Sequence, residues 1–166
     1  MNRKEKSSSS EIKAERREKM INEVYNQDLF KVPQGYYLAH CISADFALGA
    51  GIAKQFVNVY NMREKLKEFY PIREGNKCNA ENVGTALLVD NVFNLVTKKR
   101  AFNKPTYDSL YDSLVDMRDQ CEERMITKLA IPQIGCGLDK LEWSKVKELI
   151  EDVFEDINID ILVCIL

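Results

Sequence analysis

The stretch Pro132-Gln133-Ile134-Gly135-Cys136-Gly137-Leu138-Asp139 places two glycines and a carboxylate between an apolar run and a helical pattern. Residues 127–132 are typical of a buried strand, and residues 142–157 are typical of an amphipathic helix. Glycine lets the main chain approach a ligand closely or adopt a positive φ, and amides at a helix N-terminus attract anions. The stretch therefore predicts a phosphate-binding loop. An ordinary strand-to-helix turn is the alternative that a lone Gly-x-Gly leaves open.

A second glycine loop, Gly49-Ala50-Gly51-Ile52-Ala53, follows a strand pattern and opens a helical one. The third glycine of the dinucleotide-binding fingerprint is absent, and the segment does not start the domain, so a Rossmann fold is disfavoured. Two separate glycine loops at strand ends indicate a ligand with an extended phosphate and sugar skeleton.

The rest of the chain alternates between strand and helix patterns. Strands are expected over six runs rich in β-branched and aromatic residues, namely 21–25, 36–42, 83–89, 92–97, 127–132 and 159–166. Apolar residues recur at helical spacing over 107–121 and 146–157, and Asp90-Asn91 is typical of a tight hairpin. The expected fold is therefore α/β, a three-layer sandwich with a mixed central sheet of about six strands flanked by helices.

Composition limits the class of protein. The 166 residues are 45% hydrophobic, which fits one globular domain. The formal net charge of -2 lacks the excess of basic residues that is typical of a broadly basic nucleic-acid-binding protein. Residues 1–20 hold seven basic and four acidic residues, four serines in a row, and no aromatic, leucine or valine. They are expected to form a flexible charged N-terminal tail before a folded domain over 21–166. Because no apolar run is long enough for a signal peptide or a membrane span, we expect a soluble intracellular protein.

Cysteine usage predicts reduced thiols. The five cysteines, at positions 41, 78, 121, 136 and 164, include no close-spaced pair, and His40 is the single histidine. Neither a disulfide framework nor a zinc site is indicated, so no metal and no cofactor are expected.

Three cations follow one another in Thr97-Lys98-Lys99-Arg100, at the end of an expected strand. Alternation along the strand predicts that Lys98 and Arg100 face one side and Lys99 the other. Neighbouring positive charge favours the neutral amine at Lys98, and a neutral lysine is a nucleophile toward carbonyl-like carbons. A solvated charge run is the alternative interpretation.

Taken together, these residues resemble a macrodomain of the branch that contains the terminal ADP-ribose protein glycohydrolases. The resemblance runs from about Val24 to Leu166 and rests on blocks that occur in the family's order. They are Gln27-Asp28-Leu29-Phe30, Leu38-Ala39-His40-Cys41-Ile42-Ser43, Gly49 to Ala53, Thr97-Lys98-Lys99-Arg100-Ala101, Lys104-Pro105-Thr106-Tyr107, Pro132 to Asp139, and Leu141-Glu142-Trp143.

The resemblance implies an ADP-ribose pocket at the strand ends. It implies that Asp28 accepts a hydrogen bond from the adenine amino group, and that the two glycine loops enclose the distal ribose and the diphosphate. It implies Lys98 and Asp139 as the catalytic pair. The ligand-binding set that it implies is Asp28, Leu29, His40, Ser43, Gly49, Ala50, Gly51, Ile52, Ala53, Thr97, Pro132, Ile134, Gly135, Cys136, Gly137 and Leu138.

Several of these residues also have an alternative role that is purely structural. Asp139 could instead offset the dipole of the following helix, Cys136 could be a small loop filler, and His40 could be a satisfied core histidine.

The implied reaction removes mono-ADP-ribose that is ester-linked to Glu or Asp of proteins, through a covalent lysine–sugar intermediate. Deacylation of O-acyl-ADP-ribose is a related activity. The implied partners are ADP-ribose and mono-ADP-ribosylated proteins, with poly-ADP-ribose and ADP-ribosylated nucleic acid left open. A non-catalytic ADP-ribose reader, an ADP-ribose phosphomonoester phosphatase and a hydrolase of ADP-ribosylated nucleic acid are the alternative functions. We expect a monomer in the nucleus or the cytoplasm, without a membrane partner.

Overall fold

The computed structural model describes residues 11, 12, 15 and 20–166 of the chain. Most of the expected N-terminal tail lies outside these residues. Met20, which ends that segment, is buried beside the first strand. Among the described residues, no helix combines the length and the apolar character that crossing a membrane requires.

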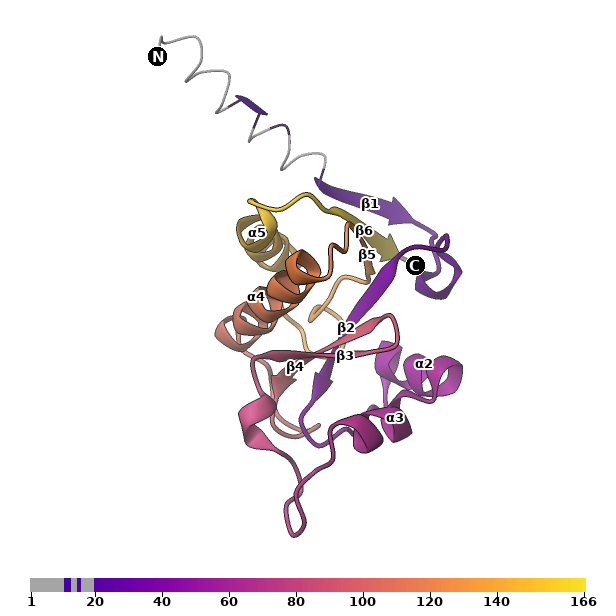
Figure 1. The fold of residues 1–166 in the computed structure, drawn as a ribbon, viewed down its shortest axis with the longest axis vertical. Coiled ribbons are helices and arrows are strands. Elements are labelled where there is room, and N and C mark those ends of the chain that lie inside the picture. Colours follow the sequence, from indigo (N-terminus) through magenta and orange to yellow (C-terminus); the bar gives the residue numbers. More distant parts are fainter. Residues whose placement is uncertain (1–10, 13–14, 16–19) are drawn as a thin grey trace.

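The centre of the described chain is a mixed six-stranded sheet with the order β1-β6-β5-β2-β4-β3 (Figure 1). Its strands are β1 (Ile21–Tyr25), β2 (Tyr37–Ser43), β3 (Thr85–Val89), β4 (Val92–Lys98), β5 (Lys128–Ile131) and β6 (Asp160–Ile165). All neighbouring pairs are parallel except β3 and β4. Each strand lies where a β-branched or aromatic run predicts one, so the expected α/β sandwich is confirmed.

The antiparallel pair forms at the predicted hairpin. Val89 and Val92 face each other across Asp90-Asn91, and Asp90 adopts a φ of 53°. Aspartate tolerates this left-handed conformation better than most residues, which explains the tight reversal at this point of the sequence.

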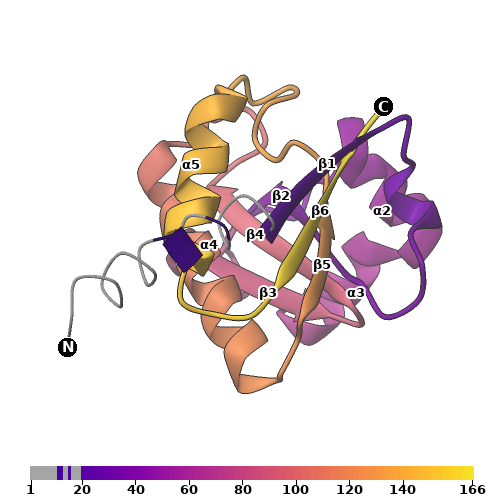
Figure 2. The same cartoon turned by 90° about the horizontal axis from the view of Figure 1, so that it is seen from above.

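Helices cover both faces of the sheet, as Figure 2 shows from above. One face carries α4 (Tyr107–Glu123) and α5 (Trp143–Phe154), and the other carries α2 (Gly51–Tyr60) and α3 (Met62–Phe69). The short helix α3 was not expected from the sequence. It follows α2 directly because Asn61 takes a φ of 57° between them, and it buries Met62 and Leu66.

Alternation along the strands divides the buried side chains into two cores. On β4, Phe93 and Leu95 pack toward α4 and α5, whereas Val92 and Val96 pack toward α2 and α3. Successive side chains of a strand point to opposite faces, and central strands that are buried on both faces therefore read as continuous apolar runs.

The parallel arrangement aligns the carboxyl ends of β5, β2 and β4 at one edge of the sheet. Loops that follow parallel strands meet at this edge, where α/β proteins bind ligands. The two glycine loops and the cationic run all follow these strands, so the topology brings the predicted functional segments together.

Candidate active site

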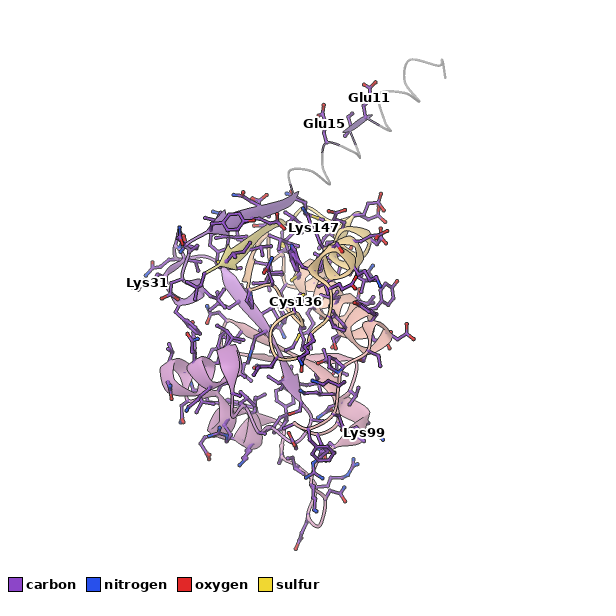
Figure 3. All side chains as sticks on the ribbon, turned by 180° about the vertical axis from the view of Figure 1, so that it is seen from behind. Glu11, Glu15, Lys31, Lys99, Cys136 and Lys147 are labelled. Carbon is purple, nitrogen blue, oxygen red and sulfur yellow. The ribbon has the colours of Figure 1, made fainter. Side chains whose placement is uncertain are left out.

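A cavity of about 850 Å³ opens at this edge, a size common for small-molecule sites. Three segments line it: the end of β2 with the loop into α2, the end of β4 with the loop toward α4, and the loop after β5. Figure 3 shows the last of these loops facing the viewer, with Cys136 labelled on it and Lys99 nearer the lower edge of the molecule.

The first glycine loop presents the start of α2 to the cavity. Ala50 occupies the N-cap position without a capping side chain, and Gly51, Ile52 and Ala53 line the cavity. The first amides of a helix have no partner within the helix and carry the positive end of its dipole. This end of α2 is therefore suited to an anionic group such as a diphosphate.

The second glycine loop approaches the first from the other side. Gly135 has a φ of 73°, which favours glycine, and a Cβ built there would lie 2.9 Å from Leu141 Cδ1, so the end of that leucine side chain would have to move. A Cβ on Gly51, whose φ is 59°, would lie 3.4 Å from Leu138 Cδ1. The Leu138 side chain thus reaches the start of α2, and the two loops close one side of the cavity.

Lys98 and Asp139 meet at the cavity wall. The Lys98 Nζ donates a hydrogen bond to Asp139 Oδ1 over 2.8 Å, and the two side chains are only 15% and 18% exposed. Lys98 is the last residue of β4, and Asp139 lies within the loop between β5 and α5. Helix α5 begins only at Trp143, behind the N-cap residue Glu142, so the partner of Asp139 is a lysine and not the first turn of that helix.

The other two cations of the run follow β4, which ends at Lys98, so the alternation of the strand does not extend to them. Lys99 is exposed, and Arg100 donates through Nε to Asp45 Oδ2 over 3.3 Å. The nearest charge to the Lys98 amine is thus the Asp139 carboxylate and not a neighbouring cation. The Lys98 side chain also reaches the cavity.

Asp45 connects two of the three segments, a role that the sequence analysis missed. Its Oδ1 accepts hydrogen bonds from Ser43 Oγ and from the Ala47 amide, and its Oδ2 accepts from Arg100 Nε and the Ala101 amide. Partial burial alone raises the pKa of Asp45, but these donors, led by Ser43, outweigh it and hold the pKa below its ordinary value. The ionised carboxylate fixes the loop after β2 against the loop after β4.

The structure brings most of the predicted site residues to one cavity. Those that line it are Ser43, Gly49, Ala50, Gly51, Ile52, Ala53, Lys98, Pro132, Ile134, Gly135, Gly137, Leu138 and Asp139. Nine further lining residues were not in the predicted set: Cys41, Ile42, Ala47, Leu48, Ala101, Phe102, Asn103, Lys104 and Gln133. Most of them are sequence neighbours of predicted residues, so extending each motif by a few positions finds them.

Five predicted ligand contacts do not line this cavity: Asp28, Leu29, His40, Thr97 and Cys136. Asp28 caps the 3-10 helix η1 (Leu29–Lys31) by accepting from the Phe30 amide over 2.9 Å, and Leu29 is buried. Both follow the end of β1, two strands beyond β5 at the same edge of the sheet. Thr97 is buried because its side chain alternates with that of Lys98 on β4.

His40 is a core residue and not a cavity residue in this structure. It is fully buried, its ring stacks on Phe56 at 3.9 Å between centroids, and its Nε2 lies 2.6 Å from Asn94 Oδ1. The Asn94 amide nitrogen donates to the Leu87 carbonyl over 3.0 Å, so the amide oxygen is the acceptor and His40 Nε2 is the donor. Burial lowers the pKa of His40 to about 4, against the opposing effect of the Asn94 hydrogen bond. The ring is therefore neutral at physiological pH.

The cysteines near the cavity are unsuited to nucleophilic attack at neutral pH. Burial, with the nearby Asp139 carboxylate and Cys136, raises the pKa of Cys41 to about 12. Burial likewise raises the pKa of Cys136 to about 11, and its Sγ donates to the Ile134 carbonyl. Since the thiolate is the reactive form, neither thiol is available as a nucleophile at neutral pH. The described residues contain no group of three His, Cys, Asp or Glu side chains placed to hold a metal ion.

Comparisons with known proteins agree with this architecture. The macrodomain of Mycobacterium tuberculosis DarG superposes with a TM-score of 0.72 at 21% identity, covering 89% of this chain and 98% of that one. The structure of Thermosipho africanus DarTG in complex with ADP-ribose gives a TM-score of 0.66 at 18% identity, covering 87% of this chain and 42% of that one. At these identities the likeness shows that the fold is that of a macrodomain.

Sequence comparison identifies the branch. No family model matches the chain. The ADP-ribose glycohydrolase OARD1 of Homo sapiens, however, is 41% identical over 139 residues, covering 82% of this chain and 86% of that protein. The Bos taurus protein of the same name matches with the same identity and coverage. With this identity over most of both sequences, the chain belongs to the macrodomain family, in the branch of the OARD1-type ADP-ribose glycohydrolases.

Proposed function

We propose that this protein is a hydrolase that releases ADP-ribose from mono-ADP-ribosylated proteins by cleaving the ester between the distal ribose and a glutamate or aspartate side chain. The observation that carries the proposal is the Lys98–Asp139 pair, joined over 2.8 Å at the wall of a cavity framed by two glycine loops. The 41% identity to proteins named ADP-ribose glycohydrolase supports the reaction class.

In this proposal, ADP-ribose lies along the carboxyl edge of the sheet. The distal ribose occupies the cavity beside Lys98, and the diphosphate lies between the start of α2 and the loop at 134–138. Neighbouring strands are about 4.8 Å apart, so Asp28, two strands beyond β5, lies about 10 Å further along the edge. An extended ligand can therefore place its adenine near Asp28 even though Asp28 lies outside the cavity lining.

The proposed chemistry begins with proton transfer from the Lys98 ammonium to the adjacent Asp139 carboxylate, which frees the amine lone pair. The amine then attacks the anomeric carbon, a C–N bond forms as the C–O ester bond breaks, and the protein carboxylate departs. The sugar ring opens to an imine on Lys98. Water adds to the imine, Asp139 returns protons in this step, and ADP-ribose is released with regeneration of the amine. Neither member of the pair suffices alone.

The test measures ADP-ribose release from a glutamate-linked mono-ADP-ribosylated protein. Wild type is expected to release it, and Lys98→Ala and Asp139→Ala are each expected to lose at least about 100-fold in rate, the scale of a general-base or nucleophile deletion. Lys98→Arg is the sharpest control, because it keeps the positive charge beside Asp139 but removes the nucleophilic amine. Activity in Lys98→Arg would contradict the covalent mechanism.

Reductive trapping adds a direct reading of the intermediate. Borohydride treatment during turnover is expected to leave a sugar adduct on Lys98 of the wild type, detected by peptide mass, and none in Lys98→Arg. Tight ADP-ribose binding without any release would instead identify a reader. Release of inorganic phosphate from an ADP-ribose phosphomonoester without ester cleavage would identify a phosphatase.

The remaining parts of the proposal concern context. We propose that the protein works inside the cell, in the nucleus or the cytoplasm, and the free cysteines among the described residues support a reducing compartment. We also propose that it acts as a monomer, because its cavity is built within one chain.

A further inference from the structure

The loop between β2 and α2 has a strained backbone. Phe46 has a φ of 54° and Leu48 a φ of 42°, although both carry bulky side chains. Such residues rarely adopt the left-handed region, and a strained conformation persists only where surrounding contacts enforce it. Both side chains are buried, and Leu48 also lines the cavity. The contacts that hold this loop therefore bear on the shape of the site.

Arg63 of α3 supplies two of these contacts without lining the cavity itself. Its Nε donates to the Ala47 carbonyl over 2.8 Å, and its Nη2 donates to the Leu48 carbonyl over 3.1 Å. A guanidinium holds its donors in a rigid planar fork, and hydrogen bonds from a charged donor are stronger than those between neutral groups. One side chain therefore fixes the orientation of two successive peptide groups.

These two carbonyls also set the direction of the amides that follow them. The peptide bonds are trans, and in a trans peptide the C=O and N–H groups point in opposite directions. The N–H groups of Leu48 and Gly49 therefore point away from Arg63, and neither donates a hydrogen bond to another residue of the described part of the chain. Since Leu48 and Gly49 both line the cavity, their amides are suited to bind an anionic group there.

We propose that Arg63 is a positioning residue for ligand binding. By holding the Ala47 and Leu48 carbonyls, it turns the amides of Leu48 and Gly49 toward the cavity, where they donate to the diphosphate of ADP-ribose. This inference rests on the proposed function, in which the diphosphate lies at the start of α2. Because Arg63 acts through the loop and makes no hydrogen bond to Lys98 or Asp139, it contributes equally to binding of the ground state and the transition state. Its loss should therefore change KM and not kcat.

The experiment measures the Kd of free ADP-ribose by isothermal titration calorimetry in Arg63→Met, which keeps an unbranched side chain on α3 but has no hydrogen-bond donor. The Kd is expected to rise about 10-fold, the scale of one lost hydrogen bond from a charged donor. KM for a glutamate-linked mono-ADP-ribosylated protein is expected to rise by a similar factor, with kcat within about twofold of wild type. Urea unfolding of each variant checks that the protein is folded under the assay conditions.

Arg73→Met is the matched control. It also removes one arginine charge, but Arg73 forms an exposed ion pair with Glu81 and does not line the cavity. Its Kd and KM are expected to equal those of wild type. Arg63→Lys keeps the charge on α3 and replaces the planar fork with a single ammonium, so it is expected to recover only part of the affinity. If Arg63→Met does not fold, the Kd of Arg63→Lys decides the inference.

Each outcome supports or overturns the positioning role. A Kd within about twofold of wild type in Arg63→Met overturns it, because a purely structural arginine would lower the urea midpoint and leave the folded protein's affinity intact. An equal loss of affinity in Arg73→Met, or full affinity in Arg63→Lys, would assign the effect to charge alone and also overturn it.

Failure of the proposed function gives a different result. Wild type that binds ADP-ribose but releases none from the modified protein refutes the proposed reaction, while the Kd comparison still decides the role of Arg63. Wild type that does not bind ADP-ribose refutes both.

Discussion

The buried side chain of His40 makes the stability of the fold depend on pH. Its Nδ1 has no hydrogen-bond partner among the described residues, and burial lowers the pKa from 6.5 to about 4. The folded ring is therefore neutral at pH values where the unfolded ring binds a proton. The contribution of His40 to the free energy of unfolding is fully present above pH 6.5. It is lost as the pH falls from 6.5 toward about 4.

We expect the free energy of unfolding to fall by about 3 kcal/mol across that pH range from this residue alone. Urea unfolding between pH 4 and pH 7 measures the slope. His40→Gln removes the only histidine of the chain and is expected to flatten it, whatever its effect at pH 7. A slope equal to that of wild type would show that carboxylates carry the pH dependence instead.

Gly135 and Gly137 offer a matched pair within one loop. Gly135 requires a φ of 73°, whereas Gly137 has an ordinary φ and open space where a methyl group would lie. Gly135→Ala is expected to cost about 1–2 kcal/mol of folding free energy, because an L-residue is strained in the left-handed region. Gly137→Ala is expected to cost less than half of that. Similar urea midpoints for the two variants would contradict this account.

At the scale of the elements, Asp45 holds the loops after β2 and β4 together. Asp45→Asn removes the charge and replaces one acceptor oxygen with an amide donor that faces N–H or O–H groups. We expect this change to lower the free energy of unfolding by about 2 kcal/mol. Asp90→Asn is the control, because the Lys65–Asp90 pair is exposed and such pairs contribute about 0–1 kcal/mol. Thermal unfolding of the two variants gives the comparison.

The same pair of variants tests whether Asp45, by joining the loops after β2 and β4, also positions Lys98. If it does, Asp45→Asn is expected to lower kcat for ADP-ribose release more than it raises KM, because the end of β4 loses its tie to the β2 loop. Asp90→Asn is expected to leave both parameters unchanged. A normal kcat in an Asp45→Asn protein of reduced stability would limit Asp45 to a structural role.

At the scale of the whole molecule, the cavity is lined by loops that only the folded sheet brings together, so a ligand that binds there is expected to stabilise the fold. Free ADP-ribose at about 100 times its Kd is expected to stabilise the protein by about 2.7 kcal/mol, or roughly 5–10 °C in Tm for a domain of this size. Lys98→Ala is expected to retain most of this shift, because the glycine loops remain.

Gly51→Val is expected to abolish that shift by placing a branched side chain between the start of α2 and Leu138. A full Tm shift in Gly51→Val would mean that ADP-ribose binds away from this cavity. The measurement is differential scanning fluorimetry with and without the ligand, compared with the intrinsic stability of each variant in urea.

The elements of the sheet could be read from the chain because their signals are local. Buried parallel strands require continuous β-branched and aromatic runs, the Asp90-Asn91 reversal requires residues that tolerate a positive φ, and α4 requires its apolar stripe. The glycine loops and the Lys98 and Asp139 positions also carry local motifs. Helix α3 was not predicted from the sequence because only Met62 and Leu66 of its eight residues are buried, which gives a weak helical periodicity.

Contacts between segments that are distant in sequence depended on the tertiary structure. Three such contacts form only when the parallel strands are aligned. They are the packing of His40 against Asn94 and Phe56, the pairing of Lys98 with Asp139 across 41 positions, and the bonds of Asp45 between the loops after β2 and β4. No local pattern encodes which partner a charge will meet, because side-chain partners are set by strand order and register. The sequence thus determined the strands, the loops and the family, and the packed sheet decided which of their side chains face the cavity.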